Sequence, residues 1–247
     1  MHEGEFKSVR GSSCMNVISL GIRDLDKALG GGFPYPCLAS IEGDFGSGKT
    51  AVTQQIGYSA LKAGFRVCVI TSETTAKEYL AMMKSIKIDP YPYYVSAKLD
   101  VFALHVEGGK WSQFLSSMFF KVTRNFLEMY KKRYDLIIID SLSMLAADTP
   151  PHVFLTFVTR MKNLVSIGKT IILTFHPNFL PENSSMKLKA SSDVYLRISN
   201  AKVAGVQVKV LKIVKLWGTT GDRKESVSLE VNPHLGLRVL PLGGVKV

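Results

Sequence analysis

The sequence predicts an α/β fold, a doubly wound and mainly parallel sheet flanked by helices. Short apolar runs alternate along the chain with segments of helical periodicity. A glycine-rich loop follows the first core strand and leads directly into a helix. After residue 193, apolar residues alternate with polar or basic ones, which predicts antiparallel C-terminal strands at the edge of the sheet. We interpret residues 1–247 as one domain, with 1–15 flexible.

The expected elements follow from apolar spacing and from helix-breaking residues. Gly64 closes the first long helix, and Pro90 and Pro92 stop the second. In segment 111–132, apolar residues recur at i, i+3, i+4 and i+7, which predicts an amphipathic helix with its apolar stripe in the core. We expect strands at 38–42, 66–71, 134–140, 170–175, 194–198, 206–216 and 227–231, and helices at 49–62, 75–86, 111–132 and 151–167.

Composition and charge limit the kinds of partner and the cellular compartment that we expect for this protein. The formal charge of +11 fits nucleic acid, an anionic membrane surface or an acidic protein, and does not choose among them. The densest apolar runs are far shorter than the roughly 18 residues of a membrane span, so we expect no direct membrane insertion. The N-terminus lacks the apolar core of a signal peptide, which predicts a cytoplasmic protein. Three cysteines without C-x-x-C spacing predict neither a disulfide framework nor a zinc site.

Residues 43–50, Gly-Asp-Phe-Gly-Ser-Gly-Lys-Thr, form a complete P-loop motif between a strand and a helix. Its glycines let the backbone turn N–H groups toward phosphates at a helix N-terminus. The alternative, a chance glycine-rich turn, does not explain this strand–loop–helix context. We predict a nucleoside triphosphate site in which Lys49 reaches the β- and γ-phosphates and Thr50 ligates Mg²⁺. The predicted binding residues are Asp44, Phe45, Gly46, Ser47, Gly48, Lys49 and Thr50.

Three further polar residues follow predicted core strands. Asp140 ends the apolar strand 134–140, where P-loop proteins hold Mg²⁺ with a carboxylate; capping of the next helix is the alternative. Glu73 follows strand 66–71 and would orient or deprotonate a water, or else supply a charge at a helix start. His176 follows strand 170–175 and either senses the γ-phosphate or is an ordinary loop histidine.

Basic residues concentrate in two regions. A solvated surface is the usual meaning of such clusters, and a docking surface is the alternative. Trp217 lies in polar surroundings and is either a packing or an interface residue. The first region comprises Lys121, Arg124, Lys131, Lys132 and Arg133, and the second Lys187, Lys189, Lys202, Lys209, Lys212 and Lys215.

Several segments resemble a known family. Residues 21–34 are similar to the entry segment of KaiC-like and RadA-like RecA-family ATPases, with the P-loop at the matching distance. Within that group, residues 42–44, 71–80 and 139–143 resemble the accessory proteins of the archaeal flagellum, the archaellum. The endings 230–233 and 243–247 are similar too, and the resemblance covers residues 16–247.

The resemblance implies a RecA-like fold that binds ATP with Mg²⁺. It further implies a homo-oligomer, a hexameric ring, at the cytoplasmic face of the membrane as part of the archaellum motor. The partners it implies are the motor ATPase FlaI and a membrane-anchored scaffold.

Two departures from active KaiC-like enzymes bear on turnover. Their second strand ends in two adjacent glutamates, whereas here Glu73 is followed by Thr74. Their late strand carries a Lys-x-Arg that reaches the neighbouring subunit's γ-phosphate; here Lys215 is kept, for a catalytic role in trans, and Trp217 replaces the arginine. An arginine finger contributes about 10³–10⁵ in rate. We therefore expect binding to persist and turnover to fail, unless Arg197 or Arg223 substitutes.

Three functions are compatible with these residues. The favoured one is an ATP-bound regulatory and structural component of the archaellum motor, with weak or no hydrolysis. The second is an active KaiC-like ATPase or autokinase that uses Glu73, Asp140 and Lys215. The third, a RadA-like DNA-binding ATPase, fits the charge, but the sequence has no helix-hairpin-helix-like N-terminal domain and no glycine- and aromatic-rich DNA loop. Nucleic acid is therefore not an expected partner.

Overall fold

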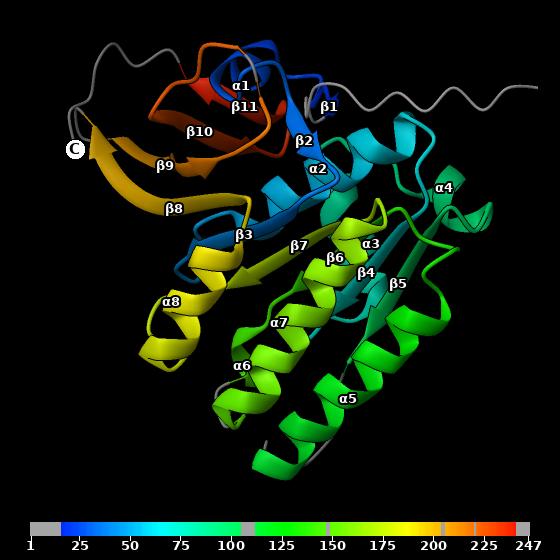
Figure 1. Ribbon diagram of the computed structural model, residues 1–247. Coiled ribbons are helices and arrows are strands. Elements are labelled where there is room, and N and C mark those ends of the chain that lie inside the picture. Colours follow the sequence, from blue (N-terminus) through cyan, green and yellow to red (C-terminus); the bar gives the residue numbers. More distant parts are fainter. Residues whose placement is uncertain (1–15, 105–111, 147–148, 204–205, 220, 241–247) are drawn as a thin grey trace, which may run out of the picture.

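Nine strands form one mixed sheet in the part of the chain that the computed structural model describes, residues 16–104, 112–146, 149–203, 206–219 and 221–240 (Figure 1). The strand order is β11-β10-β9-β8-β3-β7-β6-β4-β5, parallel from β5 to β8 and antiparallel from β8 to β11. The strands are β3 (Leu38–Gly43), β4 (Val67–Thr71), β5 (Leu99–Ala103), β6 (Leu136–Asp140), β7 (Thr170–Phe175), β8 (Val194–Val203), β9 (Val206–Leu216), β10 (Ser226–Asn232) and β11 (Gly236–Leu240). This confirms the predicted fold class.

Helices cover both faces of the parallel part of the sheet. Because successive strand side chains point to opposite faces, Ile138 packs in one core, while Ile137 and Ile139 pack in the other. The first core holds α2 (Lys49–Lys62) and α3 (Ala76–Ser85). The second holds α5 (Gln113–Met129), α6 (Ser143–Ala146), α7 (Pro151–Ser166) and α8 (Glu182–Ser191).

Smaller elements frame this body. A two-stranded antiparallel sheet joins β1 (Asn16–Ile18) to β2 (Phe33–Tyr35), with the short helix α1 (Arg23–Ala28) between them. Helix α4 (Tyr91–Val95) precedes β5. In the described ranges, no helix has the length and hydrophobicity needed to cross a bilayer. The sequence-based expectations for residues 1–15, Trp111 and the tail 243–247 concern residues outside these ranges.

The prediction that residues 194–198 form an antiparallel edge strand is wrong. Strand β8 pairs in parallel with β3, with Ser40 opposite Tyr195 and Glu42 opposite Arg197, and antiparallel only with β9. The reason is α8, which carries the chain back between β7 and β8 and so preserves the strand direction. The polar, weakly periodic sequence of α8 had not predicted a helix there. The antiparallel part of the sheet therefore begins at β9.

The prediction of a buried apolar stripe on the helix 111–132 is also wrong in its main part. Phe119, Phe120 and Leu127 of α5 are buried, but several other large apolar residues of the predicted stripe are exposed. Apolar residues occupy so much of the circumference of α5 that periodicity does not identify the packed sector. The exposed members are Phe114, Met118, Val122, Met129 and Tyr130.

Candidate nucleotide site at the carboxyl edge of the sheet

The P-loop connects the end of β3 to the first turn of α2. Gly46 and Gly48 have φ values of 68° and 97°, a region that favours glycine. A Cβ on Gly43 would lie 2.6 Å from Ser47 Oγ, so the loop leaves no room for a side chain there. Ser47 Oγ is buried and has no hydrogen-bond partner within the described residues. A tightly turned glycine loop with a spare hydroxyl at a helix N-terminus fits a bound phosphate.

The parallel strands bring the other predicted residues to the same edge. Glu73 follows β4, Asp140 ends β6 and His176 follows β7, and these strands come after β3 in the parallel sheet in the order β7-β6-β4. The carboxyl ends of parallel strands are the usual ligand edge of a doubly wound sheet. The structure thus assembles the P-loop, Glu73, Asp140 and His176 in one place.

A chain of contacts links Lys49 to Glu73 through His176. Lys49 Nζ lies 3.2 Å from His176 Nδ1, and His176 Nε2 lies 2.9 Å from Glu73 Oε1. An ammonium group only donates, so Nδ1 accepts, and Nε2 then carries the hydrogen that is donated to the Glu73 carboxylate. The buried imidazole is also held from behind, because its backbone N–H donates to Ser143 Oγ at 2.6 Å.

Lys49 is a buried cation within the P-loop. Its ammonium donates to the carbonyls of Gly43 at 2.8 Å and Asp44 at 3.0 Å. Burial lowers the pKa of Lys49, and the carboxylates of Glu73, Asp140 and Asp44 oppose that shift. Because charges interact more strongly away from water, a desolvated ammonium at this position attracts a polyphosphate well.

The hydrogen bonds at the start of α3 and at Asp140 bear on the alternative that the two carboxylates serve a helix start. Thr75 and Glu78 cap α3 reciprocally: Glu78 N donates to Thr75 Oγ1, and Thr75 N donates to a Glu78 carboxylate oxygen at 2.8 Å. Glu73 lies before this capping box and is not part of it. Asp140 accepts a hydrogen bond from Thr174 Oγ1 at 2.5 Å, within the sheet edge.

Asp140 and Thr50 form a pair suited to Mg²⁺. Hydrogen bonds from the hydroxyls of Thr174 and Thr50 lower the pKa of Asp140, but burial outweighs them and raises it. A hydroxyl beside a carboxylate matches the two protein ligands that a P-loop protein gives to Mg²⁺, with phosphates and water supplying the others. In the described ranges, no group of three or more His, Cys, Asp or Glu residues is placed to hold a metal ion.

The raised pKa of Asp140 predicts a stability effect without ligand. Burial disfavours the ionised carboxylate, so folding stability falls as the pH rises above the ordinary aspartate pKa of about 3.9. We expect Asp140→Asn to raise the melting temperature of the ligand-free protein at pH 7, with the difference shrinking toward pH 4. Melting curves at the two pH values measure this, with the exposed Asp222→Asn as control. A lower melting temperature for Asp140→Asn at pH 7 would contradict it.

Two contacts at this edge are not predicted by the sequence. They are the stacking of Phe45 on His176 and the contact of Lys209 with the P-loop. Phe45, 63% exposed, stacks on His176 with ring centroids 3.8 Å apart and planes at 25°. Lys209 Nζ donates to the Gly46 carbonyl, and its stem lies against Gly48. The β8–β9 register, which pairs Asn200 with Lys209, brings this lysine over the P-loop, and sequence alone does not contain that register.

Lys215 is not brought to the P-loop of its own chain. It pairs with Tyr195, which pairs with Ser40, three residues and roughly 10 Å before the P-loop begins at Gly43. Its ammonium donates to the carbonyl of Ala190 at 3.0 Å. Lys215 therefore makes no contact with the P-loop of its own chain among the described hydrogen bonds.

The two candidate substitutes for the missing arginine differ. The guanidinium of Arg197 donates to Glu42 within its own chain. Arg223 is exposed and donates to the carbonyl of Leu216 at 3.0 Å, next to Trp217, which is itself 65% exposed. Arg223 thus contacts the residue that precedes Trp217, whereas Arg197 is engaged with Glu42.

This sheet topology and this loop define a RecA-like P-loop protein. The family model of the KaiC ATPase matches residues 18–243. The chain belongs to the FlaH family of KaiC-like ATPases. It is 39% identical over 226 residues to the archaeal flagellar ATP-binding protein FlaH of Sulfolobus acidocaldarius, covering 92% of this chain and 97% of the relative. The FlaH of Methanocaldococcus jannaschii is 28% identical over 90% of this chain and 94% of the relative.

Solved structures agree with this assignment. The crystal structure of the flagellar accessory protein FlaH from Methanocaldococcus jannaschii superposes with a TM-score of 0.82 at 25% identity, covering 92% of this chain and 100% of the other. A KaiC-like protein from Pyrococcus horikoshii superposes with a TM-score of 0.72 at 20% identity, covering 92% and 100%. The second likeness concerns the fold alone.

Proposed function

We propose that this protein is an ATP-binding regulatory component of the archaellum motor, in which Mg-ATP acts as a conformational ligand and is hydrolysed weakly or not at all. One observation carries the proposal. The phosphate edge is assembled within the chain, while Lys215 is hydrogen-bonded to the Ala190 carbonyl and Trp217 stands where an arginine finger is expected. Binding therefore needs one chain, and fast turnover needs a group that this chain does not supply.

Each site residue has a role in that scheme. Lys49 and the P-loop amides bind the phosphates, and Thr50 and Asp140 hold Mg²⁺. His176 contacts Lys49 on one side and Glu73 on the other, so a γ-phosphate that draws Lys49 away from the P-loop carbonyls also changes the Glu73 contact. ATP at about 1,000 times its Kd stabilises the bound form by about 4 kcal/mol, which is enough to select one conformation without hydrolysis.

The proposal extends to assembly and location. Residues 1–247 act as one RecA-like domain in a homo-oligomer, a hexameric ring, that meets the motor ATPase FlaI and a membrane-anchored scaffold at the cytoplasmic face of the membrane. The relatives' names, archaeal flagellar ATP-binding protein and flagellar accessory protein, support an archaellum role. The position of Lys215, opposite Tyr195 and away from the P-loop of its own chain, supports a ring.

A working KaiC-like ATPase or autokinase is the second candidate. Glu73 is partly exposed, lies at the phosphate edge and accepts a hydrogen bond from His176, so it is placed to orient a water or a hydroxyl group. Arg223, beside Trp217, would then supply the missing cation in trans.

Phosphate release from Mg-ATP at several protein concentrations distinguishes the two, with Lys49→Ala as the blank. We expect a rate at or below about 10⁻³ s⁻¹ with ATP demonstrably bound, the level of an unassisted P-loop site. A rate near 1 s⁻¹, about the low end for phosphoryl-transfer enzymes, that rises with protein concentration and is lost in Glu73→Gln would establish the enzyme instead.

A further inference from the structure

Helix α5 carries an exposed apolar ridge formed by Phe114, Met118, Val122 and Met129. Their exposed fractions are 71%, 43%, 58% and 76%. They are spaced by four, four and seven residues, which places them on one side of the helix. Scattered exposed apolar residues are ordinary, but several large ones on one side of a helix mark an interaction surface.

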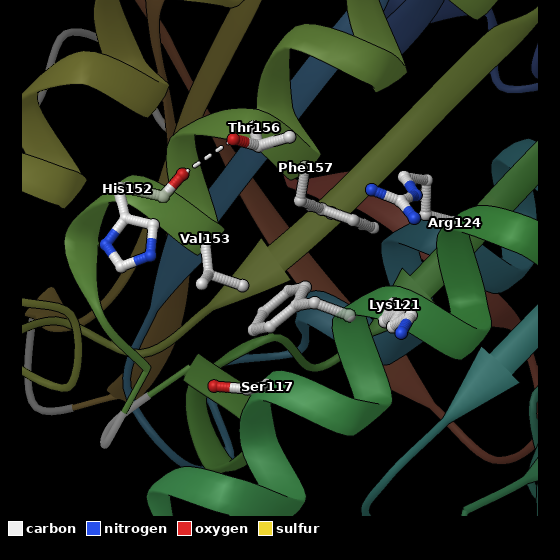
Figure 2. Close-up of a pocket in the computed structure, with 8 residues that line it drawn as sticks. Ser117, Lys121, Arg124, His152, Val153, Thr156 and Phe157 are labelled. Atoms are coloured by element: carbon white, nitrogen blue, oxygen red, sulfur yellow. Dashed lines mark hydrogen bonds between the residues drawn. The ribbon is translucent and has the colours of Figure 1, made fainter.

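A pocket of about 310 Å³ is lined by side chains of α5 and α7, and its residues Ser117 and Lys121 are the chain neighbours of Met118 and Val122 in the ridge (Figure 2). The two helices pack against each other on the same face of the sheet, opposite the face covered by α2 (Figure 1). Apolar side chains and cationic ones both line the pocket. The apolar residues are Phe120, Val153 and Phe157; the polar ones are Ser117, Lys121, Arg124, His152 and Thr156.

The charge around the pocket is one-sided. Among the described residues no carboxylate lines it, and α7 contains neither Asp nor Glu. Within the described residues, Lys121 and Arg124 form no ion pair; the Arg124 guanidinium donates only to the side chain of its neighbour Asn125. The single acid of α5, Glu128, is paired with Lys131 at 3.5 Å. These free cations beside an apolar pocket complement an acidic partner.

We propose that the α5–α7 face binds an acidic amphipathic helix of a partner protein. One large apolar side chain of that helix enters the pocket, its carboxylates pair with Lys121 and Arg124, and its remaining apolar residues cover the ridge. The pocket favours a protein over an anionic membrane, because a flat bilayer would touch the ridge without filling the cavity. The surface is independent of nucleotide turnover and goes beyond the proposed function.

The test uses two synthetic helical peptides with the same leucine and tryptophan face, one with glutamate and one with lysine on the polar face. Fluorescence anisotropy measures their binding to the full-length protein. We expect the wild type to prefer the acidic peptide, and Lys121→Glu with Arg124→Glu to weaken that binding about tenfold or more and to favour the basic peptide. Lys77→Glu with Lys98→Glu makes the same charge change at exposed positions elsewhere and should keep the wild-type preference.

A second pair of substitutions tests the apolar ridge of α5. Phe114→Ser with Met118→Ser should weaken the binding of the acidic peptide. The melting temperature should stay close to that of the wild type, because both side chains are exposed. The proposal would be overturned if Lys121→Glu with Arg124→Glu bound the acidic peptide as well as Lys77→Glu with Lys98→Glu does. It would also be overturned if Phe114→Ser with Met118→Ser left the affinity for that peptide unchanged. A third result would also overturn it. If Lys121→Glu with Arg124→Glu abolished binding to phosphatidylserine vesicles while the acidic peptide bound all variants alike, the face would be a membrane-binding surface.

Discussion

Mg-ATP at about 1,000 times its Kd is expected to raise the melting temperature of the wild type by roughly 8–16 °C and that of Lys49→Ala not at all. The stabilisation is about 4 kcal/mol, and each kcal/mol shifts a chain of this size by about 2–4 °C. Lys49 is the buried cation of the phosphate edge, so its removal takes away the charge that the triphosphate would neutralise. Differential scanning fluorimetry with and without Mg-ATP measures the shift.

Lys62→Ala is the matched control for this experiment. Lys62 is an exposed lysine in the last turn of the same helix, at the end away from the P-loop, so the control removes an equal charge without touching the site. It should keep the full shift. A shift of similar size in Lys49→Ala would mean that ATP stabilises the protein from a different site, and the assignment of the P-loop would fail.

The parallel core and the P-loop could be predicted from sequence because both depend on local signals. Residues 49–62 were predicted as a helix and form one, and residues 170–175 were predicted as a strand and form one. Buried strands of this kind consist of continuous apolar runs, and glycine and lysine at fixed spacing mark the loop between strand and helix. The position of Glu73, Asp140 and His176 at one edge follows from strand direction alone once the strands are parallel.

What could not be predicted depends on long-range pairing. The contact of Lys209 with the P-loop arises from the β8–β9 register, which joins residues that carry no mark of that pairing in sequence. The direction of β8 was predicted wrongly because the helix that reverses the chain, α8, is polar and weakly periodic. The packed sector of α5 was predicted wrongly because apolar residues that are exposed on a helix recur with the same period as those that pack in the core.

Trp217→Arg is expected to turn a binding protein into a faster ATPase. The substitution completes the Lys-x-Arg of active KaiC-like relatives on the strand end that carries Lys215. Trp217 is 65% exposed, so the arginine can be accommodated without repacking the core. An arginine finger contributes about 10³–10⁵ in rate, so we expect phosphate release to rise by at least about 10³ and to depend on protein concentration. Trp217→Ala, which removes the indole without adding a charge, should show no increase.

Mixing variants tests whether the arginine acts on a neighbour. A chain with both Lys49→Ala and Trp217→Arg is expected to bind no ATP of its own yet to present the arginine to wild-type subunits. Residue 217 follows the end of β9, at the edge of the sheet where β3 begins, whereas the P-loop follows the end of β3. We therefore expect the arginine to act on the nucleotide of another subunit, so that such a chain stimulates the wild type when the two are mixed. Stimulation only when the arginine and an intact P-loop are in the same chain would place the finger in cis. The ring interface proposed from Lys215 would then be wrong, since the register that separates the two ends within one chain is the reason for placing them in different subunits.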